Sequence, residues 1–281
     1  MSLTNRYETL ILNRLVGDTT STWTKPSSGG GTLKLHLFTT NPGETGDVSG
    51  LVTTNQGGLT LAYSRFIPTN SQSRTYTPDG SEYFNFTGVS GGETANEVVA
   101  IGLCYSGALD STKVIWTESL EGSAVRKYKD VDQLRLSKIV FGLNGTALGA
   151  DLCSAVLDHI FVESSGNSFV PVTSSYLVFY DGDPGINGTD ANPIGARVRM
   201  LPVTDANSSW TVSGGVVSNT NSLTASFNET ADITHIALRS APSNGQSGDK
   251  IYWRGPLLSP QRVEVDDILA IRAGQLALAI D

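Results

Sequence analysis

The chain has 281 residues and a formal net charge of −8, a size that suits one large domain or two ordinary ones. Charged residues are only 16% of the total and no stretch concentrates lysine and arginine, so the composition argues against nucleic acid as a partner. No apolar run approaches the roughly 20 residues that cross a bilayer, and the N-terminus lacks a signal-peptide pattern, so we expect no membrane association and synthesis in a cytoplasm.

The first predicted element is a helix over residues 5 to 16. Asn5 can cap it together with Glu8, and Gly17 ends the pattern. Its apolar positions recur at helical spacing and form what we call the N-terminal stripe: Tyr7, Leu10, Ile11 and Leu15. We expect this stripe either to pack on its own domain or to contact a neighbouring subunit.

Strand patterns follow the helix. Leu33, Leu35 and Leu37 alternate with polar residues, and a similar alternation runs through "VAIGL", residues 99 to 103. The first of these strands leads directly into "TTNPGETGD", residues 39 to 47. Proline fixes φ at the first position of a turn and glycine supplies positive φ at the next, so this stretch predicts a tight turn.

The second half of the chain repeats this plan. A helix pattern spans residues 148 to 160, and "SSYLVFY" then leads into "DGDPGINGT", residues 181 to 189. "THIAL", residues 234 to 238, and the leucine-rich residues 276 to 280 read as further strands. Short strands between Gly, Asn, Ser and Pro turns, with few helices, are typical of an antiparallel sandwich.

Matching segments occur in the same order in both halves, which indicates a tandem duplication. Besides the two Pro-Gly turns, "VAIGL" matches "THIAL", Trp116 matches Trp253, and "VDQLRL" from Val131 matches "VDDILAI" from Val265. The fold class we predict is mainly β, with two tandem antiparallel β-sandwich domains, each preceded by one short α-helix. The domains are 1–144 and 145–281.

A short N-terminal helix, then "LHLFTTNPGETG", a Tyr/Arg strand such as "YSRF", a "THIAL"-like strand and a leucine-alternating last strand together resemble a known family. The chain is similar to small virion proteins of tailed bacteriophages, of the tail fibre or minor structural protein type. Those relatives generally have one domain, whereas this chain has two. The resemblance implies a virion location and a structural role on the tail, neck or capsid.

The residues suited to metal binding are few. Asp181, Asp183, Asn187 and Asp190 place oxygen atoms near the second Pro-Gly turn, where Ca²⁺ could bind, but the first turn has Thr39 and Asn41 instead of acids. We leave open whether these four bind a cation. Cys104 and Cys153 are flanked by apolar residues, and we expect free thiols in the core.

Candidate catalytic groups lack partners in the sequence. "GVSGG" satisfies the pattern that displays a nucleophilic Ser90, but a loop and a strand follow it where hydrolases have a helix. The three histidines, His36, His159 and His235, fall in different elements without a second ligand at metal-binding spacing. Asp266 and Asp267, with Asp132 at the matching place, are explained by turns into a strand.

Aromatic residues allow two interpretations. Trp116 and Trp253 stand at matching positions, which favours core packing over a sugar-stacking platform. An adhesion module that binds a receptor or glycan would instead use exposed aromatics, and four residues qualify: Trp23, Tyr76, Tyr83 and Trp210.

The sequence therefore predicts a non-enzymatic virion subunit without cofactor. We expect no catalytic, cofactor-binding or metal site. The expected partners are other virion proteins of the capsid, neck or tail, together with further copies of the same chain. Receptor or glycan binding is the alternative function, and a hydrolase acting through Ser90 is a third.

Overall fold

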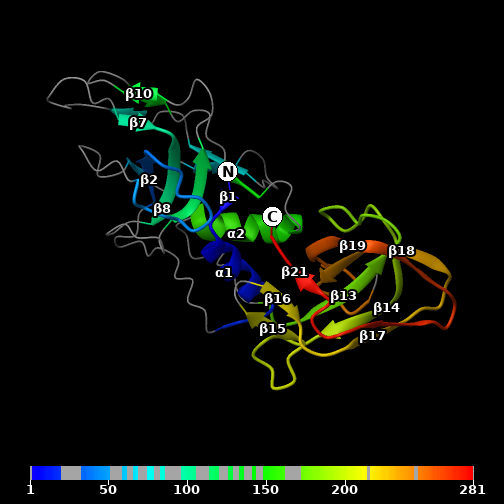
Figure 1. The fold of residues 1–281 in the computed structure, drawn as a ribbon. Coiled ribbons are helices and arrows are strands. Elements are labelled where there is room, and N and C mark those ends of the chain that lie inside the picture. The colour runs from blue at the N-terminus through cyan, green and yellow to red at the C-terminus, as the bar shows by residue number, and fades with distance from the viewer. Residues whose placement is uncertain are drawn as a thin grey trace. The chain divides into compact units, whose positions relative to one another are not determined.

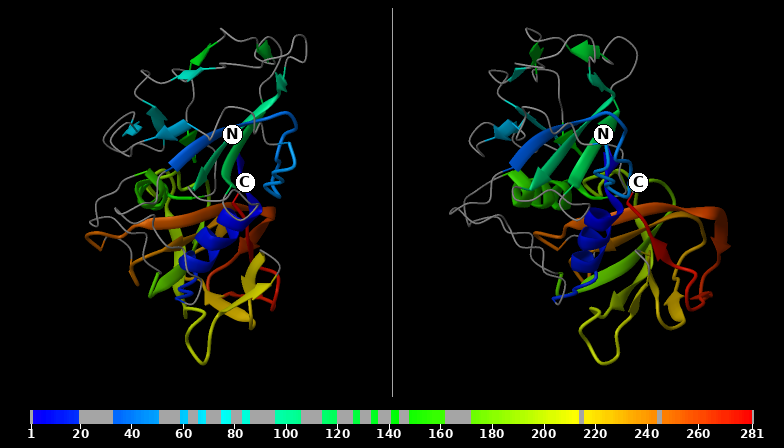
Figure 2. Two further views of the ribbon diagram at one scale, coloured as in Figure 1. Left: turned by 90° about the vertical axis from the view of Figure 1, so that its left-hand side faces the viewer. Right: turned by 60° about the vertical axis from the view of Figure 1, so that its left-hand side comes forward.

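The computed structural model describes residues 2–19, 33–50, 59–61, 66–68, 75–78, 83–85, 96–105, 114–119, 126–128, 133–135, 141–143, 148–161, 172–213, 216–243 and 246–280. Within these ranges strands predominate, two helices occur, and the strand pairs are antiparallel (Figure 1, Figure 2). The predicted mainly β, antiparallel fold class is confirmed.

The chain forms two compact units. Unit 1 comprises Met1–Glu8, Thr24–Gly142 and Leu157–Asn167, and unit 2 comprises Thr9–Trp23, Leu143–Val156 and Ser168–Asp281. Each helix therefore has its first residues in the unit of its own half and its last residues in the other unit. At this coarse level the two-part organisation agrees with the sequence.

The elements up to Gly142 are, in chain order, β1 (Ser2–Leu3), α1 (Asn5–Leu15), β2 (Leu33–Phe38), β3 (Leu59–Leu61), β4 (Phe66–Pro68), β5 (Thr75–Pro78), β6 (Tyr83–Asn85), β7 (Asn96–Val98), β8 (Ala100–Tyr105), β9 (Val114–Ser119), β10 (Arg126–Tyr128), β11 (Gln133–Arg135) and β12 (Phe141–Gly142). The main sheet has the order β1-β9-β8-β2-β3, and the smaller sheets have the orders β12-β5-β4, β11-β6 and β10-β7.

The remaining elements are α2 (Ala150–Phe161), β13 (Ser175–Tyr180), β14 (Pro193–Met200), β15 (Trp210–Ser213), β16 (Val216–Asn219), β17 (Leu223–Ser226), β18 (Ala231–Arg239), β19 (Ile251–Val263), β20 (Ile268–Ile271) and β21 (Ala277–Leu278). Their sheets have the orders β14-β13-β18-β19, β15-β16-β21 and β17-β20. The rings of Phe179 in β13 and Phe227 after β17 meet edge to face, with centroids 5.5 Å apart, so sheets pack against each other in unit 2.

The two sets of sheets correspond strand by strand. The order β9-β8-β2-β3 matches β19-β18-β13-β14, β12-β5-β4 matches β21-β16-β15, and β11-β6 matches β20-β17. The short pair β10-β7 corresponds to the outer ends of β19 and β18, because Val98 pairs with Arg126 as Ile233 pairs with Gln261. "VAIGL" runs into β8, and "THIAL" lies in β18.

The pairing register also corresponds. In the main sheet of unit 1, Leu103 pairs with Leu35 on one side and with Trp116 on the other. In unit 2, Leu238 pairs in the same way with Leu177 and Trp253. Since a slip of one residue moves every side chain to the opposite face of a sheet, an equal register puts corresponding side chains on the same face.

Both helices start from the same kind of anchor. The amide of Asn5 donates to the Glu44 carbonyl in the first Pro-Gly turn (2.9 Å), and the amide of Ala150 donates to the Ile186 carbonyl in the second (3.0 Å). Two residues before each of these amides the chain meets a strand, because Leu3 pairs with Trp116 of β9 and Leu148 bridges to Trp253 of β19. These bonds satisfy helix N-terminal amides that would otherwise lack a partner.

The cores contain the apolar residues that the alternation placed inside. Trp116 and Trp253 are 1% and 6% exposed, as core packing requires, and Cys104 and Cys153 are buried free thiols. In the N-terminal stripe, Tyr7, Ile11 and Leu15 are buried within the chain, and Leu10 is half-buried. No helix among the described residues is long and apolar enough to cross a membrane.

Candidate functional site: an apolar hollow in unit 2

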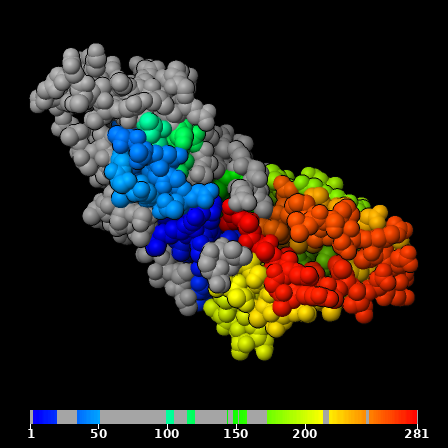
Figure 3. Space-filling model, in the orientation of Figure 1, coloured from blue at the N-terminus to red at the C-terminus, as the bar shows by residue number. Residues whose placement is uncertain are grey.

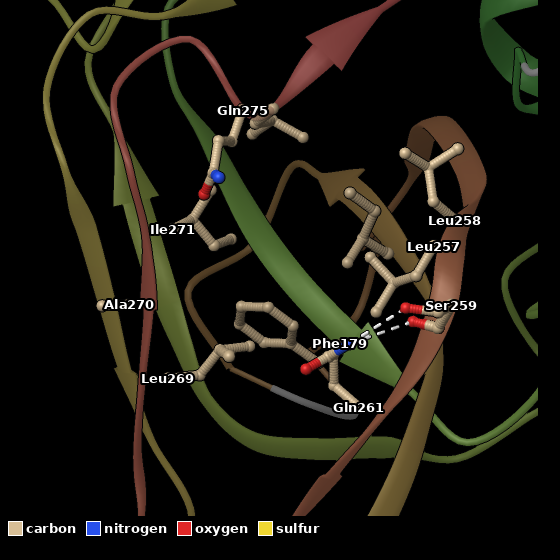
Figure 4. A pocket seen from close by; sticks show the side chains of 11 residues that line it. Phe179, Leu257, Leu258, Ser259, Gln261, Leu269, Ala270, Ile271 and Gln275 are labelled. Atoms are coloured by element: carbon tan, nitrogen blue, oxygen red, sulfur yellow. Dashed lines mark hydrogen bonds between the residues drawn. The ribbon is translucent and has the colours of Figure 1, made fainter.

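Unit 2 contains a hollow of about 410 Å³ between β19 and β20. The ring of Phe179 from β13 lies inside it, with the side chains of Gln261 and Gln275 on either side (Figure 4), and Ile236 from β18 also lines it. The complete lining is Phe179, Ile236, Leu257, Leu258, Ser259, Gln261, Leu269, Ala270, Ile271, Gln275 and Leu276. None of these side chains carries a charge, so the hollow is suited to an apolar group.

One wall is a bulge in β19. Pairing with β18 passes from His235↔Pro256 to Ile233↔Gln261, so residues 257 to 260 stand outside the ladder. Pro256 and Pro260 bracket the bulge and restrict its backbone, because proline fixes φ. Leu258 at its centre is 110% exposed, the most exposed large apolar side chain of the described residues. Leu258 therefore projects into solvent beside the hollow.

The opposite wall is β20. Leu269 and Ile271 are half-buried towards the hollow, while Ile268 and Ala270 alternate with them and are exposed. The turn into β20 is held by Asp267, whose carboxylate accepts from the Glu264 amide (2.8 Å), while Asp266 adopts φ 68°. Asp266 and Asp267 thus lie in a turn into a strand, as the sequence indicated.

Asn219 holds the end of the hollow. It is only 2% exposed, and its amide donates to the carbonyls of Asn221 and Arg272 at 2.8 and 2.9 Å. Its side-chain oxygen accepts from the Leu276 amide at 2.9 Å. The segment that carries Gln275 and Leu276 is therefore fastened to β16. The C-terminal residues, orange and red in Figure 3, form a continuous surface over this region.

The candidate cation ligands lie around the second Pro-Gly turn, where one of them is already bound to an arginine. The Asp183 carboxylate accepts from Arg254 Nη1 at 2.5 Å through both oxygens, and from the Gly185 amide at 2.9 Å. Partial burial raises the pKa of Asp183, but the hydrogen bonds from Gly185 and Arg254 and the charge of Arg254 outweigh it and hold the pKa below its usual value. Asp181 and Asn187 are exposed, as is Asp190. Among the described residues no group of three or more acidic, histidine or cysteine side chains is arranged to hold a metal.

A buried ionic cluster, which sequence reasoning missed, supports this turn. Asp249 Oδ2 lies 2.9 Å from both Arg197 Nη2 and Arg239 Nε, and the three side chains are between 5% and 9% exposed. Arg239 Nη1 also donates to the Gly188 carbonyl (2.8 Å) and the Tyr180 hydroxyl (2.9 Å). Arg197, Arg239 and Asp249 are separated by up to 52 residues in the sequence, so no local pattern predicts the cluster.

The other candidate residues are not brought together. Ser90, Asp132 and Trp23 lie outside the described residues, as do the side chains of Tyr76, Tyr83 and His159. His36 is buried in β2, whereas His235 lies in β18 of the other unit, 3.0 Å from the Thr234 hydroxyl. The expectation that Trp210 is an exposed aromatic is wrong: it is 3% exposed, because β15 turns the indole into the core of unit 2.

Residues 148–279 match the family model described as podophage GP4 fiber I protein gp80. The match starts just before α2, covers the second set of sheets and includes every residue of the hollow. No curated protein matches the chain. The half of the chain that carries the hollow is therefore similar to a fibre protein of a podophage, which agrees with the tail-fibre resemblance of the sequence.

Proposed function

We propose that the chain is a structural component of a fibre on a tailed phage particle. The observation that carries this proposal is the match of residues 148–279 to a podophage fibre family. A fibre subunit associates with other virion components, so the expected location is the virion, with synthesis in the host cytoplasm. Whether it is mounted on the tail, the neck or the capsid follows from the experiment below.

A second part of the proposal is that residues 1–144 and 145–281 are tandem copies of one helix-plus-sandwich module. The equal strand order, the equal register around Leu103 and Leu238, and the equal helix anchors at Asn5 and Ala150 support it. The match to the family model falls on the second of these two ranges.

We propose a non-enzymatic role without cofactor. A catalytic carboxylate needs an oxygen that is free to exchange a proton with the substrate, and a pKa near the working pH. Asp183, Asp249 and Asp267 instead accept hydrogen bonds that hold turns and loops. Ser90→Ala provides the test, because it should leave infectivity and envelope degradation unchanged. Loss of hydrolysis with the fold intact would show an enzyme instead.

The N-terminal stripe belongs to the proposal as a subunit contact. Leu10 is the member best placed for it, since it is half-buried while Tyr7, Ile11 and Leu15 are already covered. In Leu10→Asp, purified protein that folds but no longer incorporates into particles supports the contact. Unchanged incorporation into particles would show that Leu10 makes no contact with another subunit.

Labelling of assembled particles tests the role directly. A short peptide tag placed after β21, detected by gold particles or by electron cryomicroscopy, should appear on a fibre. Labels absent from purified particles would contradict the proposal, whereas labels on the tail, the neck or the capsid identify the mounting site. A glycan array with the purified chain tests the alternative, since an adhesion module retains a sugar and a purely structural subunit does not.

A further inference from the structure

The hollow and the leucine beside it form one surface feature. Leu258 projects from the β19 bulge with its whole side chain in solvent, and the hollow opens between this bulge and β20. Leu257, Leu269 and Ile271 supply apolar walls around the ring of Phe179 (Figure 4). A fully exposed leucine forfeits the free energy that its burial would give, so covering Leu258 would stabilise whatever complex buries it.

We propose that this surface binds a second copy of the chain, with Leu258 of each copy seated in the hollow of the other. A projection and a recess within one patch are what a two-fold contact requires, because both copies present the same surface. The hollow, at about 410 Å³, is ample for one leucine side chain. This contact rests on the proposed fibre role and gives residues 145–281 a partner, a second copy of the chain.

Charge favours a copy of this chain as the occupant. Two chains of net charge −8 repel each other, and the repulsion is weakest where both surfaces are neutral. The lining of the hollow and the Pro-Leu-Leu-Ser-Pro bulge carry no charge. The two glutamine amides, Gln261 and Gln275, line the hollow and offer hydrogen bonds across the contact.

Sedimentation velocity on the full-length purified chain tests this contact. Wild-type protein should form dimers, and Leu258→Asp should weaken the dimer by more than about a hundredfold, since each dimer loses two seated leucines and gains two charges. Ile268→Asp is the matched control, because Ile268 is 70% exposed on the opposite face of β20 and should leave the dimer unchanged. Circular dichroism should show native spectra for both variants.

A disulfide between chains locates the contact. Leu258→Cys in one tagged chain and Ile271→Cys in a differently tagged chain should cross-link on mild oxidation, because Ile271 lines the hollow on the inward face of β20. The two native thiols stay unreactive because both are 0% exposed. A monomeric wild type, a dimer that Leu258→Asp leaves intact, or cross-linking no faster than with Ile268→Cys would each overturn the proposal. Because these measurements need no particle, their failure is separate from failure of the particle labelling.

Discussion

Asp249 is the counterion of two buried arginines in unit 2. Its carboxylate accepts from Arg197, Arg239 and the Ala241 amide, so it neutralises two buried cations and fixes the loop between β18 and β19. A buried charge without its partner is far more costly than a buried pair. The same type of ion pair at the surface, Arg262 with Asp232, has side chains that are 62% and 61% exposed.

Asp249→Asn should therefore lower the free energy of unfolding by about 3–5 kcal/mol, because two buried arginines lose their counterion. Asp232→Asn is the control and should change it by less than about 1 kcal/mol, as expected of an exposed pair. Urea denaturation followed by tryptophan fluorescence measures both. Equal effects of the two substitutions would contradict this account of the cluster.

Cys104 gives a pH prediction at the same scale. Burial raises the pKa of its thiol to about 12, whereas the unfolded thiol ionises near 9. Because the folded pKa is the higher one, the protonated thiol contributes stability below about pH 9 that is lost as the pH rises towards 12. We expect the urea midpoint to fall over this range, and to fall less in Cys104→Ala. A thiol reagent at pH 8 should leave Cys104 unmodified until the chain is unfolded.

The Pro-Gly turn is the element that organises each half. An Asx-type bond closes it in both copies, from the Gly43 amide to Asn41 and from the Gly185 amide to Asp183, each at 2.9 Å. Each turn also accepts a hydrogen bond from a helix N-terminus: the Glu44 carbonyl from the first amide of α1, and the Ile186 carbonyl from the first amide of α2. One local motif thus positions two elements, the strand that enters it and the helix that docks on it.

The two turns also predict different costs for the same substitution. Gly43 and Gly185 have φ of 59° and 68°, so alanine is strained by about 1–2 kcal/mol at either position. A Cβ at Gly43 would meet no atom within 4 Å, whereas one at Gly185 would lie 1.9 Å from the Asp190 carboxylate. Gly185→Ala should therefore destabilise the chain more than Gly43→Ala in thermal unfolding. An equal loss would show that Asp190 moves aside freely.

At the scale of the whole molecule, the corresponding sheets place one tryptophan at the same position in each unit. Trp116 and Trp253 lie in corresponding edge-side strands, and the Trp253 indole also donates to the Ala279 carbonyl at 2.9 Å. Both rings are buried, and the backbone of each pairs with a residue just before a helix, Leu3 before α1 and Leu148 before α2.

Trp116→Ala and Trp253→Ala should each cost about 3–5 kcal/mol, as large-to-small changes of a buried aromatic do. Hydrogen exchange should lose protection first in β8 and β9 for Trp116→Ala and in β18 and β19 for Trp253→Ala. Protection lost first in β18 and β19 for Trp116→Ala, or in β8 and β9 for Trp253→Ala, would argue against separate cores.

The mainly β fold class and the antiparallel pairing of its strands could be predicted from the amino-acid sequence alone. Alternation over residues 33–37 and 99–103, and the Pro-Gly turns at Pro42 and Pro184, are local signals, because side-chain direction and turn geometry depend on neighbouring residues. The matching of "VAIGL" with "THIAL" as parts of a tandem repeat stays a prediction.

Which polar and apolar groups contact one another depends on the tertiary packing of segments that are far apart in the sequence. Asp183 looked available to a cation until Arg254, seventy-one residues later, was found on its carboxylate. Trp210 looked exposed because one residue in a short strand has no pattern that tells inside from outside. The hollow joins β13, β18, β19 and β20, and Phe179 and Ile236 read as ordinary core. Contacts between distant segments depend on how sheets pack, and that packing is a property of the whole chain that no local pattern encodes.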